Sequence, residues 1–167
     1  MRQVDGKTIS ETRVEINELM LPPDANMYGN VHGGTIMKLI DNAASIVAFR
    51  HARTNVVTAS VDRLDFWNPV FIGNLLSLRA SINYAGRTSM EVGVRVDAEN
   101  LQTGERTHCA SAFLTFVALD EAGQPAEIPP LILETEKDER RWNDAKERRE
   151  ARLQHLRDRQ ETGKDPS

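Results

Sequence analysis

The sequence predicts an α+β fold in which one curved antiparallel β-sheet wraps around a single long helix. The first observation is a stretch from Thr35 to about His51 whose apolar residues recur three or four positions apart, as on one face of a helix. The second is the chain after residue 54, where apolar and polar residues alternate in four successive segments. An antiparallel sheet has one face that needs covering, and one helix covers it only if the sheet curls around it.

The predicted elements follow one another in a simple order. A first strand is expected at residues 12–16, where polar and apolar residues alternate, and a loop with two prolines follows at 21–26. After the helix, strands are expected at 57–61, 76–84, 90–96 and 110–116, with turns at 86–88 and 100–105. Because bare edge strands pair readily with other chains, we also expect oligomerisation.

The charge pattern divides the chain into a folded unit, residues 1–134, and a charged extension, residues 135–167. The extension holds 10 of the 21 basic and 9 of the 25 acidic residues, and two prolines at 129–130 precede it. Apolar and other residues spaced three or four apart between 142 and 156 predict that it is partly helical. It is either a solvated helix that frays after Gln160 or a tail that docks on a neighbouring subunit or a ligand's phosphates.

Composition excludes several classes of protein. The 167 residues fit one domain, and a net charge of −4 argues against non-specific nucleic-acid binding. Cys109, the single cysteine, rules out an intrachain disulfide framework and is expected to be an inert buried residue. The four histidines show no metal-ligand spacing, so no metal site is expected. Without an apolar run of about 18 residues or a signal-like N-terminus, we expect a soluble cytoplasmic protein.

Two features near the predicted helix can carry chemistry. Gly33 and Gly34 open the helix, where unshielded backbone N–H groups and the helix dipole can hold a developing oxyanion. Alternatively, the two glycines only let the helix begin close to the sheet. Asp41 lies at the edge of the apolar stripe beside small residues, where a carboxylate can act as base or nucleophile, although such an aspartate can also be simply solvated.

The spacing of these residues has a consequence for the site. Asp41 lies eight residues beyond Gly33, which is about 12 Å along a helix axis, so the two groups of one chain cannot grip the same small reacting group. If both participate, the site is shared between two subunits. Asn26 can orient a water or a carbonyl, or be an ordinary turn residue. The turn at 87–89 can bind a phosphate, or be an ordinary polar hairpin.

A series of motifs in this order resembles the hotdog-fold acyl-CoA thioesterases, in particular the cytosolic, brain-type acyl-CoA hydrolase branch. The longest is LPPDANMYGNVHGGTIMKLID at residues 21–41. The match continues through VVTASVD at 56–62, FWNPV at 66–70, GRTS at 86–89 and a final strand at 112–118. It covers about residues 10 to 130, and the charged extension lies outside it.

The resemblance implies a fold, an assembly and roles for individual residues. It implies hydrolysis of acyl-CoA to fatty acid and coenzyme A, with no cofactor beyond the coenzyme A of the substrate. The net charge and the hydropathy separately predict that neither nucleic acid nor a membrane is a partner. It also implies a homodimer with a continuous sheet and an active site at its interface, assembled into trimers or hexamers. Asp41 matches the catalytic carboxylate, Asn26 the loop asparagine of the other subunit, and Gly33 and Gly34 the segment that polarises the thioester oxygen. The residues that match substrate-binding or coenzyme A-lining regions are His32, Thr58, Ala59, Ser60, Phe66, Asn68, Pro69, Arg87, Thr88 and Ser89.

Three other functions compete with hydrolysis. A hotdog enoyl-CoA hydratase would use an Asp and His pair in its loop, which Asp24 and His32 superficially offer, but the mid-helix Asp41 favours the thioesterase. A non-catalytic acyl-CoA sensor would tolerate loss of Asn26 or Asp41, and both are present. A purely structural oligomer would need neither a channel nor this carboxylate. The sequence leaves open the acyl chain length and the choice between general base and nucleophile.

Overall fold

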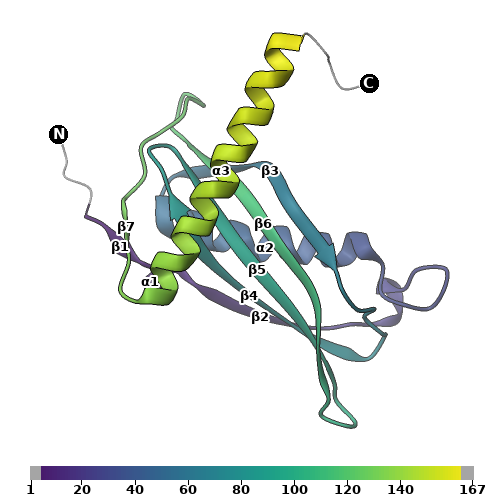
Figure 1. Ribbon diagram of the computed structural model, residues 1–167. Coiled ribbons are helices and arrows are strands. Elements are labelled where there is room, and N and C mark those ends of the chain that lie inside the picture. Colours follow the sequence, from purple (N-terminus) through teal and green to yellow (C-terminus); the bar gives the residue numbers. More distant parts are fainter. Residues whose placement is uncertain (1–4, 163–167) are drawn as a thin grey trace.

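The computed structural model describes residues 5–162 and contains a five-stranded antiparallel sheet with a long helix, α2, against one face (Figure 1). The strand order in this sheet is β2-β4-β5-β6-β3, so β2 and β3 form its edges. A separate parallel pair joins β1 to β7. In chain order the elements are β1 (Lys7–Thr8), α1 (Ile9–Thr12), β2 (Val14–Leu19), η1 (Pro22–Asp24), α2 (Gly33–Ala52), β3 (Asn55–Phe66), β4 (Asn74–Ala85), β5 (Ser89–Asn100), β6 (Arg106–Leu119), β7 (Leu131–Ile132) and α3 (Glu136–Thr162).

Helix α2 and the sheet bury one aliphatic core between them. The buried side chains of α2 recur at helical spacing on one side: Ile36, Ile40, Ala43, Ala44, Val47, Ala48 and His51. Alternate residues of the central strands meet them, including Leu76, Leu78, Ile82, Val92, Val94, Val96 and Phe116. The aromatic share of the chain is only 5%, and the core is accordingly aliphatic.

The predicted fold is confirmed, with differences at the element ends. Helix α2 begins two residues earlier than Thr35, because His32 caps its first turn. The prediction for the first strand was wrong at its start: residue 12 ends the short helix α1, and β2 begins at Val14. The later strands extend beyond their alternating cores, because polar residues near the hairpins still pair with their neighbours.

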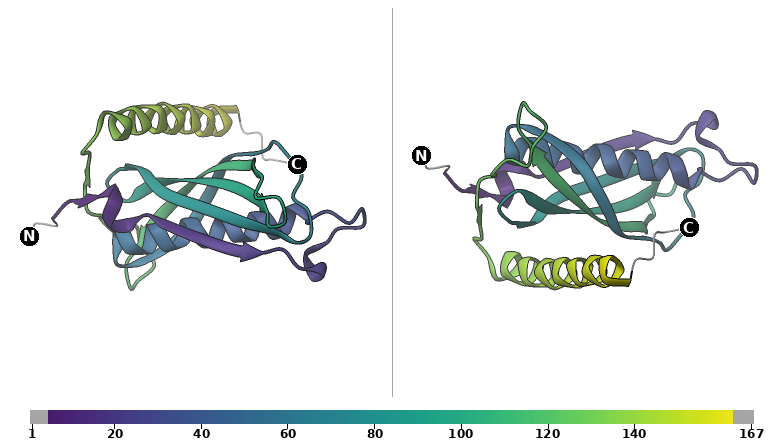
Figure 2. Two further views of the ribbon diagram at one scale, coloured as in Figure 1. Left: turned by 90° about the horizontal axis from the view of Figure 1, so that it is seen from below. Right: turned by 90° about the horizontal axis from the view of Figure 1, so that it is seen from above.

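The charged extension forms α3, which lies on the opposite face of the sheet from α2 (Figure 2). Ala145 is fully buried there, Trp142 packs against the Tyr84 ring with centroids 5.3 Å apart, and the Arg148 guanidinium lies 3.9 Å from the Phe113 ring centroid. The extension is helical over Glu136–Thr162, and the side of this helix that faces the sheet is packed against it. The helix runs past Gln160 to Thr162. Among the described residues no helix has the length and apolarity needed to cross a membrane.

The edge strand β3 is irregular in a way that matters for the site. It pairs only with β6, and its register shifts twice, between Thr58 and Ser60 and again between Val61 and Arg63. Each shift leaves one residue of β3 without a partner, as in a β-bulge. Bulges re-aim side chains, so the direction of the β3 side chains cannot be derived from simple alternation.

Candidate active site

The loop before α2 is held in one shape by Asn26. Its side-chain oxygen accepts hydrogen bonds from the backbone N–H groups of Tyr28 at 2.9 Å and Asn30 at 3.2 Å. Gly29 takes φ +83° within this turn, a conformation that favours glycine. The Val31 N–H then donates to the Val70 carbonyl at 2.8 Å and ties the loop to the segment after β3. The Asn26 amide NH₂ makes no hydrogen bond to the rest of the described chain.

The start of α2 distinguishes its two glycines. The Gly34 N–H donates to His32 Nδ1 at 2.9 Å, so His32 serves as the helix N-cap. The prediction that both glycines offer free donors is therefore wrong for Gly34, because a side chain already occupies its N–H. The Gly33 N–H has no hydrogen-bond partner within residues 5–162, which leaves it available to a ligand at the positive end of the helix dipole.

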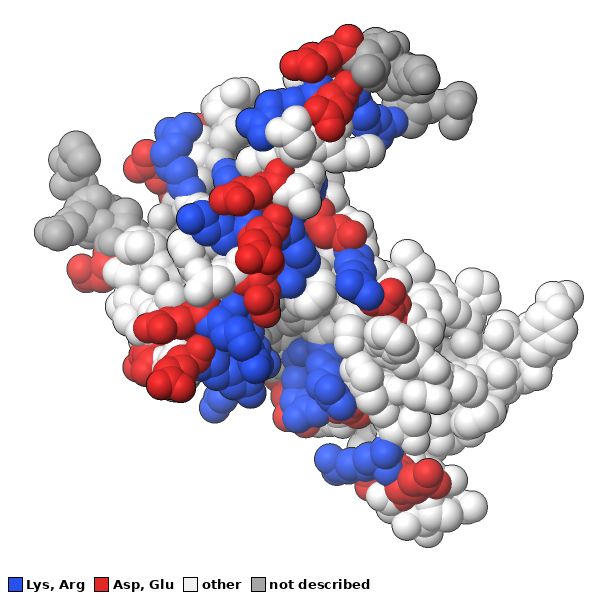
Figure 3. Space-filling view, in the orientation of Figure 1, with Lys and Arg blue, Asp and Glu red and all other residues white. Residues whose placement is uncertain are grey.

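A cavity of about 360 Å³ opens at this helix start. Its lining joins predicted residues to unpredicted ones: Asn26, Asn30, Val31, Gly33, Ile36, Phe66, Trp67, Asn68, Pro69 and Val70. A Cβ placed on Gly33 would lie 3.8 Å from Phe66 Cζ, so the end of β3 borders the helix start. Asn68 Nδ2 donates to the His108 carbonyl at 2.8 Å and anchors this rim to β6. The protruding loop beside the cavity carries no charged surface (Figure 3) and exposes Met27 and Tyr28.

Asp41 lies elsewhere on α2, half-buried and facing β3. Its Oδ1 accepts a hydrogen bond from Thr58 Oγ1 at 2.8 Å. Helix α2 runs without interruption through both residues, so Asp41 stands about 12 Å along the axis from Gly33 and does not line the cavity. The structure therefore brings Asn26, Gly33, Phe66, Asn68 and Pro69 together, and it brings Asp41 to Thr58. Within one chain these two groups stay apart.

The other residues predicted to bind the substrate lie away from the cavity, in the middle of β3 and in the turn between β4 and β5. Ala59 and Ser60 follow Thr58 in β3, and Ser60 Oγ donates to Asp62 Oδ1 at 2.7 Å. The turn at 87–89 joins β4 to β5 at the end of the sheet where β3 begins, because the Ala118 N–H donates to the Thr88 carbonyl. Phe66 pairs at the other end of β3, so the turn and the cavity are at opposite ends. Arg87 is 81% exposed there, 3.7 Å from Glu127.

Sequence reasoning missed part of the cavity wall. Three residues of the wall lie in irregular segments: Asn30, Val31 and Val70. The backbone hydrogen bond between Val31 and Val70 joins positions far apart in the chain. Periodicity gives no signal in such segments. The only sequence signal is that these residues stand inside or next to the conspicuous runs at 21–41 and 66–70.

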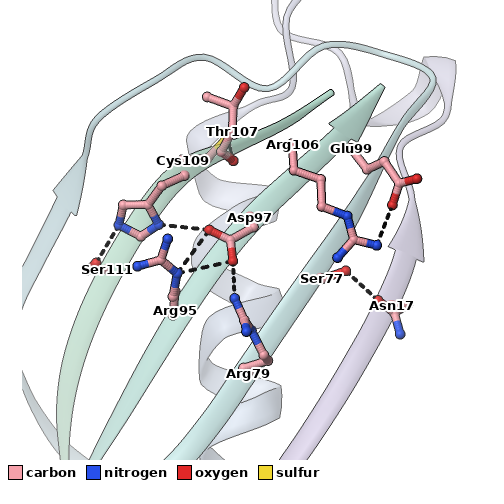
Figure 4. Close-up of polar contacts among 11 residues, drawn as sticks. Asn17, Ser77, Arg79, Arg95, Asp97, Glu99, Arg106, Thr107, Cys109 and Ser111 are labelled. Atoms are coloured by element: carbon pink, nitrogen blue, oxygen red, sulfur yellow. Dashed lines mark hydrogen bonds and ion pairs between the residues drawn. The ribbon is translucent and has the colours of Figure 1, made fainter. Parts of the chain in front are cut away.

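A second polar cluster lies on the outer face of the sheet (Figure 4). Asp97 accepts hydrogen bonds from Arg79, Arg95 and His108, and His108 Nε2 lies 2.9 Å from Ser111 Oγ. Burial of Asp97 opposes ionisation, but the hydrogen bonds from Arg95, His108 and Arg79 outweigh it and hold its pKa below the usual range. Ser111 lies in β6, which pairs with β5 on one side and β3 on the other. The cluster cross-links β4, β5 and β6 through Arg79, Asp97 and His108.

Comparisons with known proteins decide the family. A family model described as the thioesterase superfamily matches residues 28–105. A solved apo-hexameric acyl-CoA thioesterase superposes with a TM-score of 0.87 at 40% identity, covering 92% of this chain and 98% of that one. The chain belongs to the thioesterase superfamily. The hotdog fold and the family resemblance of the sequence are thereby confirmed.

Two further relatives of this thioesterase-superfamily chain carry informative names. The cytosolic acyl coenzyme A thioester hydrolase of Rattus norvegicus is 38% identical over 146 residues, 86% of this chain, and the chain spans only 38% of that protein's length. The acyl-CoA hydrolase of Staphylococcus aureus, solved with butyryl coenzyme A and coenzyme A, has a TM-score of 0.85 at 35% identity, covering 93% and 95% of the two chains. Three more structures of it carry single alanine substitutions of an aspartate, an asparagine and a threonine.

Proposed function

We propose that this chain hydrolyses acyl-CoA thioesters to a carboxylic acid and coenzyme A. One observation carries the proposal: a thioesterase-superfamily fold holds the Asp41 carboxylate on α2 by a 2.8 Å hydrogen bond from Thr58. The named relatives act on, or were solved with, acyl-CoA compounds. The residue types substituted in the Staphylococcus aureus hydrolase are also the types found here at Asp41, Asn26 and Thr58.

The proposed chemistry needs one carboxylate and one oxyanion donor. Asp41 acts either as general base, taking a proton from water, or as nucleophile on the thioester carbonyl carbon. As oxygen bonds to that carbon, the Gly33 N–H stabilises the negative charge on the carbonyl oxygen. The carbon–sulfur bond then breaks, and the coenzyme A thiolate leaves and takes up a proton, which on the general-base route is the one that Asp41 took from water. On the nucleophilic route the acyl group remains on Asp41 as an anhydride, and a water molecule hydrolyses it to release the carboxylic acid and restore the carboxylate. Thr58 keeps the carboxylate turned toward the reacting carbon by its hydrogen bond.

The complete site is shared between two copies of the chain. In one copy Asp41 and Gly33 stand about 12 Å apart along α2, so a second copy must supply Gly33 and Asn26 to each Asp41. The free edge of β3 supports this pairing, because its exposed Val57 and Val61 offer an apolar surface and unpaired backbone groups. By two-fold symmetry, each dimer of two chains then holds two equivalent sites. Hexameric relatives support further assembly into a trimer of dimers.

The substrate occupies surfaces on both sides of this interface. The acyl group and reacting carbon lie by the uncharged cavity at the start of α2, whose lining is mainly apolar. Coenzyme A runs along β3 past Thr58 and Ala59, whereas Ser60 faces α3 and donates to Asp62. The exposed guanidinium of Arg87 and the hydroxyls of Thr88 and Ser89 are available to its phosphates. A cytoplasmic location is part of the proposal, supported by the cytosolic rat relative.

Thiol release from a panel of short to long acyl-CoAs tests the proposal. We expect the parent to turn over and Asp41→Asn to lose about 10²–10⁴-fold in kcat, because the isosteric amide cannot act as base. The oligomer and the melting temperature should stay those of the parent. Tight coenzyme A binding without turnover would identify a sensor, and hydration of an enoyl-CoA would identify a hydratase. Full activity in Asp41→Asn would remove Asp41 from the mechanism.

A further inference from the structure

The bulge at Ala59 turns neighbouring β3 side chains to opposite faces of the sheet. Thr58 pairs with Phe116, a core residue, and its hydroxyl reaches Asp41 on α2. Ser60, two residues later, pairs with Thr115 on the face toward α3. The register is regular from Asn55 to Thr58, so Thr58 shares the face of the buried Val56, and the extra residue Ala59 turns Ser60 to the opposite face. The bulge therefore begins directly after the residue that donates to Asp41 and separates it from the part of β3 that faces α3.

Asp62, the unpaired residue of the second bulge, accepts one hydrogen bond from its own strand and one from the neighbouring strand β6. Its Oδ1 accepts from Ser60 Oγ at 2.7 Å, and its Oδ2 accepts from Thr115 Oγ1 on β6 at 2.5 Å. The Asp62 side chain is only 12% exposed. One carboxylate thus ties the residue after the first bulge to the neighbouring strand, across an edge where the regular ladder is interrupted twice.

Helix α3 supplies the charge that this carboxylate needs. Arg152 Nε lies 3.3 Å from Asp62 Oδ1, an ion pair that is not aligned as a hydrogen bond. One helical turn earlier, Arg148 pairs with another buried carboxylate and donates two hydrogen bonds to it, from Nε and Nη2 to Glu91 at 3.0 and 2.8 Å. Glu91 belongs to β5, where it accepts a hydrogen bond from Asn83 at 3.0 Å and lies opposite Thr115 of β6. The two pairs dock the same helix, but only the pair of Arg152 and Asp62 reaches β3.

We propose that Asp62 and Arg152 are positioning residues that hold the double bulge of β3 so that Thr58 faces Asp41. The inference rests on the proposed function for its catalytic consequence. In this arrangement α3 supports the active site from the opposite face of the sheet, through a carboxylate that never touches the substrate. Loss of either side chain loosens the bulge and lets Thr58 turn away from Asp41.

The test compares Asp62→Ala and Arg152→Met with Arg148→Met, which removes the matched ion pair on β5. We expect kcat for acyl-CoA hydrolysis to fall about tenfold to a hundredfold in the first two, with little change in KM, because misplacement by about 1 Å has such effects. Arg152→Lys should recover most of the loss. Arg148→Met should keep the parent kcat even if its melting temperature falls. Equal kcat losses in Arg148→Met and Arg152→Met would overturn the proposal, since helix docking alone would then explain them.

A double-mutant cycle shows whether Asp62 acts through Thr58. If it does, Thr58→Ala combined with Asp62→Ala should be no slower than Thr58→Ala alone, whereas independent effects would multiply. Hydrogen exchange of the β3 amides gives a readout that needs no activity: exchange should rise around residues 57–63 in Asp62→Ala and not in Arg148→Met. A parent inactive on every acyl-CoA defeats the proposed function, while unchanged β3 exchange in Asp62→Ala defeats the positioning role.

Discussion

At the scale of single residues, the hydrogen bond from Thr58 to Asp41 is the contact that defines the candidate site. It joins α2 to the edge strand and fixes one carboxylate oxygen at 2.8 Å from a hydroxyl. The glycines at the helix start have different roles, because His32 occupies the Gly34 N–H and leaves that of Gly33 open. Neither distinction can be obtained from residue types alone, since each depends on where a neighbouring side chain points.

Removal of the Thr58 hydroxyl tests that contact directly. We expect Thr58→Val to lower kcat by about tenfold to a hundredfold, the range for losing a hydrogen bond to a charged group. Thr58→Ser keeps the donor and should retain the parent rate within a few-fold. Steady-state thiol release measures both. Equal rates for the valine and serine variants would show that the hydroxyl does not orient Asp41.

At the scale of elements, the C-terminal end of α2 is fixed by contacts far along the chain. The fully buried His51 lies 2.7 Å from the Pro129 carbonyl, and Lys7 Nζ donates to the carbonyls of Arg50 and His51. A carbonyl only accepts, so His51 Nε2 carries a proton and donates it, while the buried Nδ1 has no hydrogen-bond partner within the described part of the chain. This arrangement ties the first residues and the segment before α3 to the helix that carries Asp41.

The stability of this junction should depend on pH. Burial lowers the pKa of His51 below its usual 6.5, outweighing the contact with Pro129, and nearby Lys7 lowers it further. The unfolded chain therefore binds a proton before the folded chain does. The free energy of unfolding therefore has its full contribution from His51 above pH 6.5, and this contribution falls as the pH drops below that value.

Urea unfolding of the parent and His51→Gln between pH 7.5 and 5 measures this dependence. Below pH 6.5 the free energy of unfolding of the parent should fall by up to about 1.4 kcal/mol per pH unit more than that of the variant, because glutamine can donate to Pro129 without titrating. Parallel stability curves for the two proteins would show that His51 titrates alike in both states.

At the scale of the whole molecule, the two halves of the candidate machinery lie apart in one chain. Asn26 and Gly33 border the cavity, while Asp41 lies about 12 Å along the same helix. Charged side chains gather along α3, and the surface around the protruding loop is uncharged (Figure 3).

Mixing two inactive variants tests whether the site is shared. Asp41→Asn and Asn26→Ala, denatured together and refolded, should recover about a quarter of parental activity, because half of the random dimers hold one intact site of two. Each variant refolded alone serves as control. Recovery no greater than in these controls would place Asn26 and Asp41 of one site in the same chain.

The sequence by itself determined that one long helix packs on one antiparallel sheet, and it determined the identity of the candidate residues. Helical spacing and strand alternation reflect burial on one side of an element, so α2 and the order of the strands along the chain could be predicted directly. Asp41, Asn26 and Gly33 could be named because their chemistry depends on residue type. The bulges of β3 could not be predicted, since an inserted residue is defined only by the strand it pairs with.

Tertiary structure alone decided how those residues are used. It sent Thr58 toward α2 and Ser60 toward α3, and it gave the Gly34 N–H to His32. It also brought α3, a helix that reads as solvent-exposed from its charges, against the sheet through Arg148 and Arg152. The physical reason is common to all three: periodicity encodes which side of an element is buried, whereas the partner of a polar group is set by contacts between segments distant in the chain.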